Sequence, residues 1–503
     1  MITLILPNLS ANLQAILPEI ALALTLVAIV VFDLIFIKSK KFLPFISLVG
    51  LAIAFSFVVL QFGNPKSAFA VFENASLLSL DNFSSFFKIL ILITTAFIVL
   101  FSISSKEINS CPDRHGEYYA LIFGMVIGMF FMVSANDLIL VYLSLELLSL
   151  SSYVLAGFVK TSVRNSEASL KYIIYGSASS GIMLFGISIL YGITGSTNLT
   201  EINSLLQFPN ANQLTFLISI LMIFAGIGFK ISIVPFHFWT PDVYEGAPIS
   251  ITAFLSVASK AAGFAVLIRF LKITFAQDLA QSGYWQMISY IDWQTLLILF
   301  SIITMTFGNF AALWQDNLKR MLAYSSIAHA GYLMLGVAVL SDQGIMAVLI
   351  YFAIYLFMNL GAFYVVMLIA NKIDSEEIDD YKGLGYSLPF LGTALGIFLV
   401  SLTGLPPTAG FIGKLYLFIA LVDAKMITVA IIALLNTVIS LYYYIRVLKA
   451  MFLVRSDKKQ VEIPLSPLNY VVLILLIAPV LILGIYFSPL VNIAKESVQL
   501  LGF

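Results

Sequence analysis

A lysine and a histidine bracket a proline in the apolar stretch GIGFKISIVPFHFWTPDVYEGAPIS, which runs from Gly226 to Ser250. Lys230 precedes Pro235, and His237 follows the proline by two residues. Both side chains can bind and release a proton, and their spacing of seven places them on one face of a helix. Proline breaks or kinks a helix, and the freed backbone groups are tolerated in a membrane only where protein or water lines the break. The stretch therefore predicts a broken membrane helix beside a polar site, which is typical of an ion or proton path.

Other ionisable residues interrupt apolar stretches elsewhere in the chain. Glu146 lies in LELLSLSSYVL, Lys171 in SLKYIIYG, Lys260 in SKAAGFA, His329 in SSIAHAGYLM and Lys414 in GFIGKLYLF. A charge at the centre of a membrane helix costs about 2.5–3.5 kcal/mol, so several of them would exceed the net stability of a typical domain unless they face one another or water. We therefore expect one row of titratable site residues, comprising Glu146, Lys171, Lys230, His237, Lys260, His329 and Lys414.

Each of these residues also has a simpler structural interpretation. Lys171 lies about one turn inside its helix, so its ammonium could reach the membrane surface. Lys414 could cap a helix break, and His329 could be a hydrogen-bonded core histidine. The serines around Glu146 could bind its carboxylate, although serine is also common at plain helix–helix contacts.

A proton relay through these groups is energetically reasonable. Removal from water favours the neutral form of a lysine, and a nearby carboxylate favours its charged form. At an effective dielectric constant near 20, a unit charge about 7 Å away contributes roughly 2.4 kcal/mol. Movement of Glu146 or Lys171 could therefore switch Lys230 between holding and releasing a proton, which His237 and Lys260 would pass towards Lys414.

The elements that must position these residues are membrane helices. Of the 503 residues 61% are hydrophobic and 10% charged, and the mean hydropathy is +1.02, whereas soluble domains average about 45–50% apolar and about 25% charged residues. The net charge of zero argues against nucleic acid as a partner. Apolar runs of about 20 residues fit the bilayer core. We predict an all-α membrane protein with about fourteen transmembrane helices, at 13–37, 42–62, 80–104, 118–134, 138–160, 167–193, 212–240, 248–274, 291–313, 318–339, 343–371, 386–424, 425–453 and 468–490.

Basic residues give the orientation of these helices. With both termini outside, most of the 26 Lys and Arg residues fall on the inner side, whereas Lys88 and Arg269 are among the few near the outer side. This asymmetry supports the helix count, because omitting one helix would reverse the side assigned to every later loop and remove the excess of basic residues on one side. The first apolar segment lacks a basic start and is too long for a signal peptide, so we expect it to be retained.

A second proline break divides the long apolar run near Pro406–Pro407, about 170 residues after the break near Pro235. Paired, proline-interrupted helices in corresponding positions are a sequence indication of an internally repeated transporter. We predict N-terminal helices 1–3 in residues 1–117, a first five-helix repeat in 118–276, a second in 277–454, and helix 14 in 455–503.

No cofactor or metal site is recognisable in this chain. Its single cysteine, Cys111, can form neither an internal disulfide nor a CxxC site. No haem motif and no glycine-rich dinucleotide fingerprint is present in the sequence.

The motifs quoted above, together with TGLPPTAGFIGKLYLF, resemble those of the antiporter-like subunits of respiratory complex I over nearly the whole chain. The start, LPEIALALTLVAIVVFDL, and the overall length are most similar to the subunit N group. Lys414 departs from the glutamate expected in subunit M, and the chain lacks the long lateral helix of subunit L. The superfamily also contains multi-subunit cation/proton antiporters.

This resemblance implies two inverted five-helix repeats, each with a discontinuous helix, which together form one proton channel. By residue match, Glu146 and Lys171 would be a modulating ion pair and Lys230 the central proton carrier. His237 and Lys260 would connect it to the exit lysine, Lys414, with His329 on the central axis. One departure is that Lys230 precedes its break while Lys414 follows its own, so the two copies would not be functionally identical.

The function implied by the resemblance is that of a proton-translocating subunit of a NADH (or ferredoxin):quinone oxidoreductase, in the inner membrane of a bacterium. NAD, FMN, iron–sulfur clusters and quinone would bind to partner subunits, and the membrane partners would be subunits M, K, J, A and H. The alternative is a subunit of a cation/proton antiporter without redox coupling, which would show sodium-dependent exchange. A purely structural membrane spacer is the third hypothesis, and the buried charges argue against it.

Overall fold

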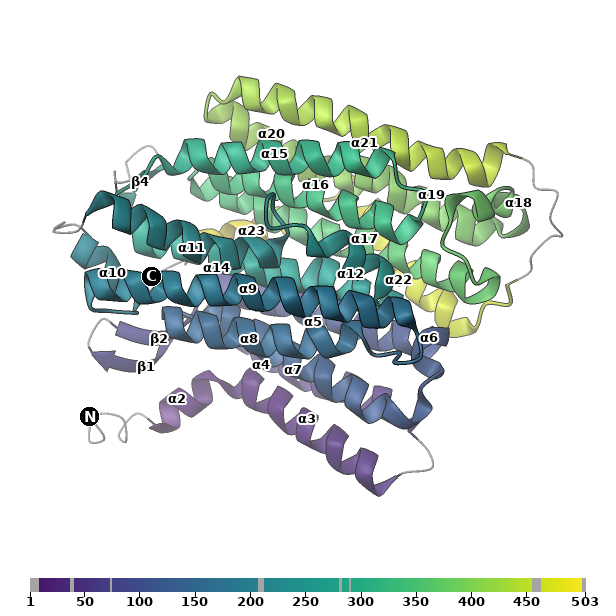
Figure 1. Ribbon diagram of the computed structural model, residues 1–503, viewed down its shortest axis with the longest axis horizontal. Helices are drawn as coiled ribbons and strands as arrows, with labels where there is room; N and C mark the ends of the chain where they lie inside the picture. Colours follow the sequence, from purple (N-terminus) through teal and green to yellow (C-terminus); the bar gives the residue numbers. More distant parts are fainter. Residues whose placement is uncertain are drawn as a thin grey trace.

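The computed structural model describes residues 9–36, 40–72, 75–206, 212–279, 283–288, 291–454 and 463–499. Its long helices run side by side along the longest axis of the molecule, with the N-terminal helices at one edge and α21 (Ile427–Leu453) at the opposite edge (Figure 1). The prediction of an all-α membrane protein is confirmed.

The N-terminal part consists of α2 (Leu9–Ala15), α3 (Leu17–Ile35), α4 (Leu43–Gln61) and α5 (Asn82–Ser104), with short turns α6 (Lys106–Asn109) and η2 (Pro112–Arg114). The next group comprises α7 (His115–Ser134), α8 (Leu138–Ala156), α9 (Val163–Thr194), α10 (Leu199–Leu206), α11 (Gln213–Ile231), α12 (Trp239–Gly246), α13 (Ile249–Phe254), η3 (Leu255–Ser259) and α14 (Lys260–Phe275). The third group comprises α15 (Trp293–Leu313), α16 (Leu318–Ala338), α17 (Asp342–Ile373), η4 (Ile378–Tyr381), α18 (Leu384–Ser387), α19 (Pro389–Thr403), α20 (Ala409–Asp423) and α21. The chain ends with α22 (Pro467–Ile485) and α23 (Ser488–Gln499).

Among the described residues, 13 helices are long and apolar enough to cross a membrane, and the apolar α19 is a shorter one. The prediction of about fourteen spans is therefore confirmed, including the short turn at Asn136–Asp137 between α7 and α8. The assignment of residues 1–117, 118–276, 277–454 and 455–503 to separate units stays a prediction.

Side-chain caps mark where many of the helices begin. An Asp, Asn or Ser at these positions accepts a hydrogen bond from a backbone N–H of the first turn, which would otherwise be unsatisfied. The capping residues include Asp81, Asp137, Ser162, Asn212, Asp292, Asn317 and Ser341.

Two antiparallel hairpins lie at the end of the molecule that carries α10 (Figure 1). Strand β1 (Lys66–Phe72) pairs with β2 (Ala75–Leu80), and β3 (Ala276–Leu279) pairs with β4 (Trp285–Met287). The turns α6 and α18 lie at the opposite end. Because that end carries most of the basic loops, we assign it to the inner side.

Both predicted breaks are present. Helix α11 ends at Ile231. The next residue, Ser232, adopts a left-handed conformation with φ 61°, and α12 begins at Trp239. Helix α19 ends at Thr403 and is followed by Gly404, with φ +88°, and Pro406 and Pro407 precede α20. A left-handed residue ends a helix and re-orients the chain, so each proline-containing turn separates two half-helices.

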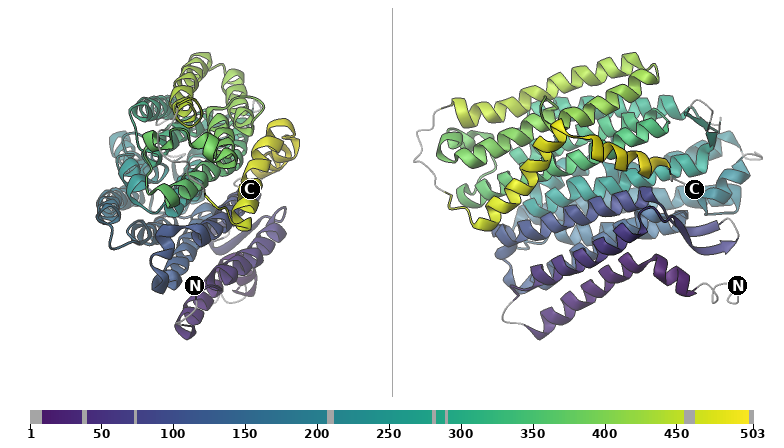
Figure 2. Two further views of the ribbon diagram at one scale, coloured as in Figure 1. Left: turned by 90° about the vertical axis from the view of Figure 1, so that its right-hand side faces the viewer. Right: turned by 180° about the vertical axis from the view of Figure 1, so that it is seen from behind.

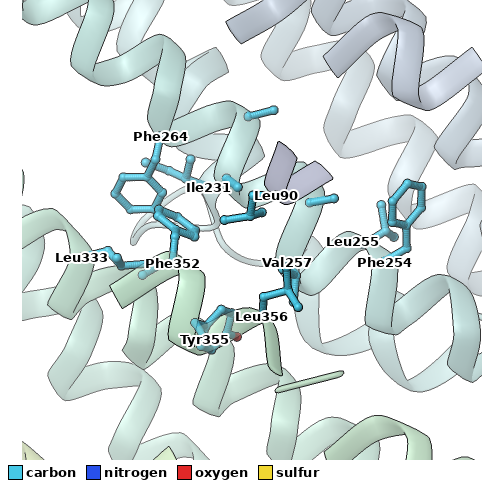
Figure 3. Packing of buried hydrophobic residues seen from close by; sticks show 14 of the residues in the cluster. Leu90, Ile231, Phe254, Leu255, Val257, Phe264, Leu333, Phe352, Tyr355 and Leu356 are labelled. Atoms are coloured by element: carbon cyan, nitrogen blue, oxygen red, sulfur yellow. The ribbon is translucent and has the colours of Figure 1, made fainter. Parts of the chain in front are cut away.

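Apolar side chains from α5, α11, α14, α16 and α17 fill the space around η3, a π-helical turn that precedes Lys260 (Figure 3). Phe264 of α14 meets Phe352 of α17 edge to face, with ring centroids 5.4 Å apart. Every residue of Ile249–Ile268 is buried, so the central helix carrying Lys260 contacts protein on all sides along that stretch. Lys260 therefore cannot reach lipid or bulk water directly.

The remaining helices complete the perimeter. Helices α22 and α23 lie across the face seen from behind, where they pack on α17 and α5 (Figure 2). Lys88 and Arg269, predicted near the outer side, lie within about two turns of the hairpin ends of α5 and α14. Both side chains are buried in ion pairs, with Glu19 and Asp81 respectively.

Candidate functional site

Lys230 lies in the last turn of α11, beside the first break, and is completely buried. Its ammonium donates to the Ser149 hydroxyl of α8 at 2.9 Å and to the Tyr172 hydroxyl of α9 at 3.4 Å. The Tyr172 ring centroid is 5.5 Å from the same nitrogen. The polar partners of this lysine are therefore neutral hydroxyl groups.

Glu146, on α8 one turn before Ser149, is the carboxylate close enough to Lys230 to interact with it electrostatically. It is half-buried, and the Tyr142 hydroxyl hydrogen-bonds to it. The structure thus brings the predicted carboxylate and the predicted proton carrier together.

Lys171 does not form the expected ion pair with Glu146. Its ammonium lies 2.7 Å from Asp242 of α12 and 2.7 Å from Glu167, one turn earlier on α9. The residue lies two turns from the inner end of α9 and its side chain is 38% exposed, so it reaches the inner surface. Asp242 competes successfully for this lysine because α12 brings it to the same end of the membrane.

Lys260 is buried at the start of α14. Its ammonium donates to the backbone carbonyl of Ser326 at 2.9 Å and to the Ser326 hydroxyl at 2.6 Å. The Tyr244 ring of α12 lies 5.8 Å from the same nitrogen. Lys260 thus connects the group of helices α7–α14 with α16.

His329 lies one turn after Ser326 on α16 and is buried. One ring nitrogen, Nδ1, is 2.7 Å from the Tyr351 hydroxyl, and Nε2 is 3.3 Å from the Tyr444 hydroxyl. Both Lys260 and Lys414 are close enough to act on this ring electrostatically. The structure therefore places His329 between two of the predicted lysines.

Lys414 is buried on α20, immediately after the second break. Its ammonium donates to the carbonyl of Thr403, the last residue of α19, at 2.7 Å. The Tyr332 ring centroid lies 4.8 Å away on α16. The lysine thus bridges the two halves of the discontinuous helix.

His237 stands apart from the other candidates. It lies in the turn between α11 and α12 and packs edge to face on Phe307 of α15, with ring centroids 4.5 Å apart. Its Nδ1 is buried without a hydrogen-bond partner among the described atoms. The contacts described for His237 do not join it to Lys230 or Lys260, so its predicted connecting role stays a prediction.

Sequence reasoning missed several partners of the site residues. Their only signal in the sequence is a hydroxyl-bearing side chain spaced to face the buried side of a helix. They are one serine and five tyrosines: Ser326, Tyr172, Tyr244, Tyr332, Tyr351 and Tyr444. The hydroxyls of Tyr244 and Tyr355 also lie close to Ser326. Hydroxyl groups both donate and accept, so such a chain can carry a proton between lysines.

Charged groups gather at the inner end of the site. Glu376 of the α17–η4 loop pairs with Lys319 at 3.0 Å and with Arg164 at 3.2 Å. Burial opposes its ionisation, but the two cations outweigh that effect and lower the pKa of Glu376. Within the described part of the chain, no three His, Cys, Asp or Glu residues are grouped as metal ligands.

These features define a class of protein: a multi-helix membrane protein with two broken helices and a buried row of lysines with neutral hydrogen-bond partners. That arrangement is typical of ion and proton transporters. The comparisons with known proteins give the particular family. Residues 135–440 match the family model described as "NADH:quinone oxidoreductase/Mrp antiporter, TM".

The chain is 47% identical to NADH-quinone oxidoreductase subunit N 2 of Chloroherpeton thalassium, over 98% of this chain and 96% of that protein. It therefore belongs to the NADH-quinone oxidoreductase subunit N family. Among solved structures it matches a chain of respiratory complex I from Thermus thermophilus with 28% identity and a TM-score of 0.76, over 95% of this chain and 100% of that one. A chain of the Mrp complex from Dietzia sp. DQ12-45-1b shares the fold, with a TM-score of 0.82 at 19% identity, over 97% of this chain and 98% of that one.

Proposed function

We propose that this chain translocates protons as the antiporter-like subunit N of a NADH (or ferredoxin):quinone oxidoreductase. The observation that carries the proposal is the state of Lys230, Lys260 and Lys414. Each is at most 3% exposed, and each ammonium donates to hydroxyl or carbonyl oxygens. A buried lysine with neutral partners can release its proton without leaving a carboxylate unpaired.

The order of the groups along the molecule gives the route. Glu146 biases the charge on Lys230, and the proton passes from Lys230, beside Tyr172, to Lys260, beside Tyr244. From Lys260 it continues to Ser326 and His329, and then to Lys414 near Tyr332.

Each transfer leaves a neutral lysine behind and a protonated group ahead, so charge is conserved along the row. His329 can take a proton on one ring nitrogen and release it from the other, because both nitrogens face a tyrosine hydroxyl. The hydroxyls of Tyr351 and Tyr444 orient the ring between Lys260 and Lys414.

The redox chemistry belongs to other chains in this proposal. NAD, FMN, iron–sulfur clusters and quinone bind to partner subunits, and the membrane neighbours are an antiporter-like subunit M and the small subunits K, J, A and H. The location is a bacterial inner membrane.

The test is Lys230→Ala in the intact complex reconstituted in proteoliposomes. Quinone reduction and proton pumping are both expected to fall, because the variant interrupts the row beside the first break. Lys382→Ala is the matched control, since that lysine pairs with Asp379 on the surface and should leave both unchanged.

Normal pumping per NADH in Lys230→Ala would contradict the assignment. Sodium-dependent proton exchange, with co-purifying transporter subunits and no iron–sulfur proteins, would favour the antiporter alternative instead.

A further inference from the structure

The short half-helix α12 carries two carboxylates, Asp242 in its first turn and Glu245 near its end. Asp242 accepts from Lys171 through Oδ2 and from Arg320 through Oδ1, both at 2.7 Å. Glu245 accepts from the same Arg320 at 2.8 Å and from Arg164 at 2.7 Å. Because Lys171 and Arg164 belong to α9 and Arg320 to α16, these ion pairs hold α12 between α9 and α16.

Two aromatic side chains of α12 contact the buried lysine row. The Trp239 ring stacks on Tyr172, with ring centroids 4.5 Å apart and planes 8° apart, and the Tyr172 hydroxyl accepts from Lys230. Tyr244, on the next turns of the same half-helix, lies over Lys260. A displacement of α12 would therefore change the surroundings of both Lys230 and Lys260.

We propose that Asp242 is a positioning residue for proton transfer, joining Lys171 to Arg320 and so fixing α12 between α9 and α16. The proposal rests on the proposed function. While both bonds are made, α12 is held on both sides. When Lys171 leaves Asp242, the half-exposed pair of Glu245 with Arg164 still joins α12 to α9, while Arg320 joins both carboxylates of α12 to α16. The balance of ion pairs then favours α16, so α12 follows α16 and the Trp239–Tyr172 stack beside Lys230 is loosened.

The geometry distinguishes Asp242 from Glu167, the other carboxylate that pairs with Lys171. Glu167 lies on the same helix as the lysine, one turn away, and its side chain is 60% exposed. A pair within α9 cannot hold α12 in place. Asp242 is 28% exposed and links α12 to both α9 and α16, so its loss loosens the half-helix and leaves Glu245 as its charged tie to Arg164 and Arg320, whereas the loss of Glu167 changes neither link.

The experiment compares Asp242→Asn with Glu167→Gln in the intact complex, by hydrogen–deuterium exchange of the backbone amides of Trp239–Gly246. Asp242→Asn is expected to speed this exchange on the order of fivefold to tenfold, since it weakens two partly exposed charge-assisted bonds. Glu167→Gln is expected to leave it unchanged. The ratio of protons pumped per NADH should fall only in Asp242→Asn, and Asp242→Glu should restore part of it.

Equal exchange rates in Asp242→Asn and wild type, or equal effects of the two variants, would overturn the proposal. If Asp242→Asn fails to assemble, Arg320→Lys is the second variant, because it keeps the positive charge but cannot contact Asp242 and Glu245 together. Unchanged amide exchange of Trp239–Gly246 in that variant overturns the proposal as well. The proposed function fails separately: it falls if Lys230→Ala pumps normally, whatever the exchange at α12. If Lys230→Ala abolishes pumping and Asp242→Asn alters neither readout, only the role of Asp242 is wrong.

Discussion

A buried ion pair between α3 and α5 allows a direct test of how the helices of the N-terminal part are held together. The Lys88 ammonium lies 2.6 Å from Oε1 of Glu19, and the two side chains are 0% and 3% exposed. The other oxygen of Glu19 has no hydrogen-bond partner among the described atoms, and the ammonium faces the Phe130 ring at 5.4 Å. Each charge therefore depends chiefly on the other.

The expected magnitudes follow from that dependence. Removing one partner of a buried pair typically destabilises a protein by about 3–5 kcal/mol, and an unpaired charge in a membrane helix costs about 2.5–3.5 kcal/mol. We therefore expect Lys88→Met or Glu19→Leu alone to reduce stability by about 3 kcal/mol, more than a hundredfold in an equilibrium constant. The double variant replaces both charges with apolar groups and should remain within about 1 kcal/mol of wild type.

The assay is the fraction of the chain that stays in the assembled complex after heating for a fixed time, read on a native gel. Lys382→Met, at an exposed pair, serves as the control and should match wild type. If the double variant dissociates as readily as either single variant, mutual compensation of the two charges is not what stabilises this contact, and the reasoning fails.

Two further predictions concern Lys414 and the inner surface. Gly404 has a left-handed backbone conformation, and a Cβ there would approach Cδ of Lys414 to 2.8 Å, so Gly404→Ala should reduce proton pumping several-fold. The control is Gly63→Ala, at a similar φ but with open space around it, which should leave pumping unchanged. Equal effects of the two variants on the pumping ratio would refute the explanation. Glu376 has a lowered pKa in the folded chain, so the stability it contributes is present above the ordinary glutamate range and is lost as the pH falls through that lowered pKa. Glu376→Gln should therefore speed amide exchange in the α17–η4 loop at pH 7, and its difference from wild type should shrink as the pH is lowered below the ordinary glutamate range. A difference that does not shrink on acidification would contradict this.

Much of the fold was predictable because long apolar runs and prolines act locally. About 20 apolar residues are the length of a membrane helix, and Pro235 and Pro406 lie in the turns that interrupt two of the apolar runs, after α11 and α19. The burial of Lys230 and Lys414 was predictable for the same reason, because a charge inside an apolar run must face protein or water.

The partners of the site residues were not predictable, because they come from distant parts of the chain. Lys171 meets Asp242, 71 positions away, and His329 meets Tyr444, 115 positions away. Sequence spacing predicts which side chains are neighbours only within one helix. Whether Lys171 pairs with Glu146 or with Asp242 depends on where α12 is packed. The buried pair of Lys88 was missed for the same reason, since its carboxylate lies 69 positions earlier on α3.

The apparent asymmetry of the two lysines at the breaks has an electrostatic resolution. Lys230 precedes its break and Lys414 follows its own, yet each lysine is associated with the C-terminal end of the half-helix before its break. Lys230 lies in the last turn of α11, and Lys414 donates to the carbonyl of Thr403, where α19 ends. The end of a helix carries unsatisfied carbonyls and a partial negative charge, which favours a cation there. The two breaks thus provide the same kind of cation site, which is reached by a lysine before the break in one case and after it in the other. The protonated form of each lysine is therefore stabilised by the half-helix that ends there as well as by the lysine's other contacts.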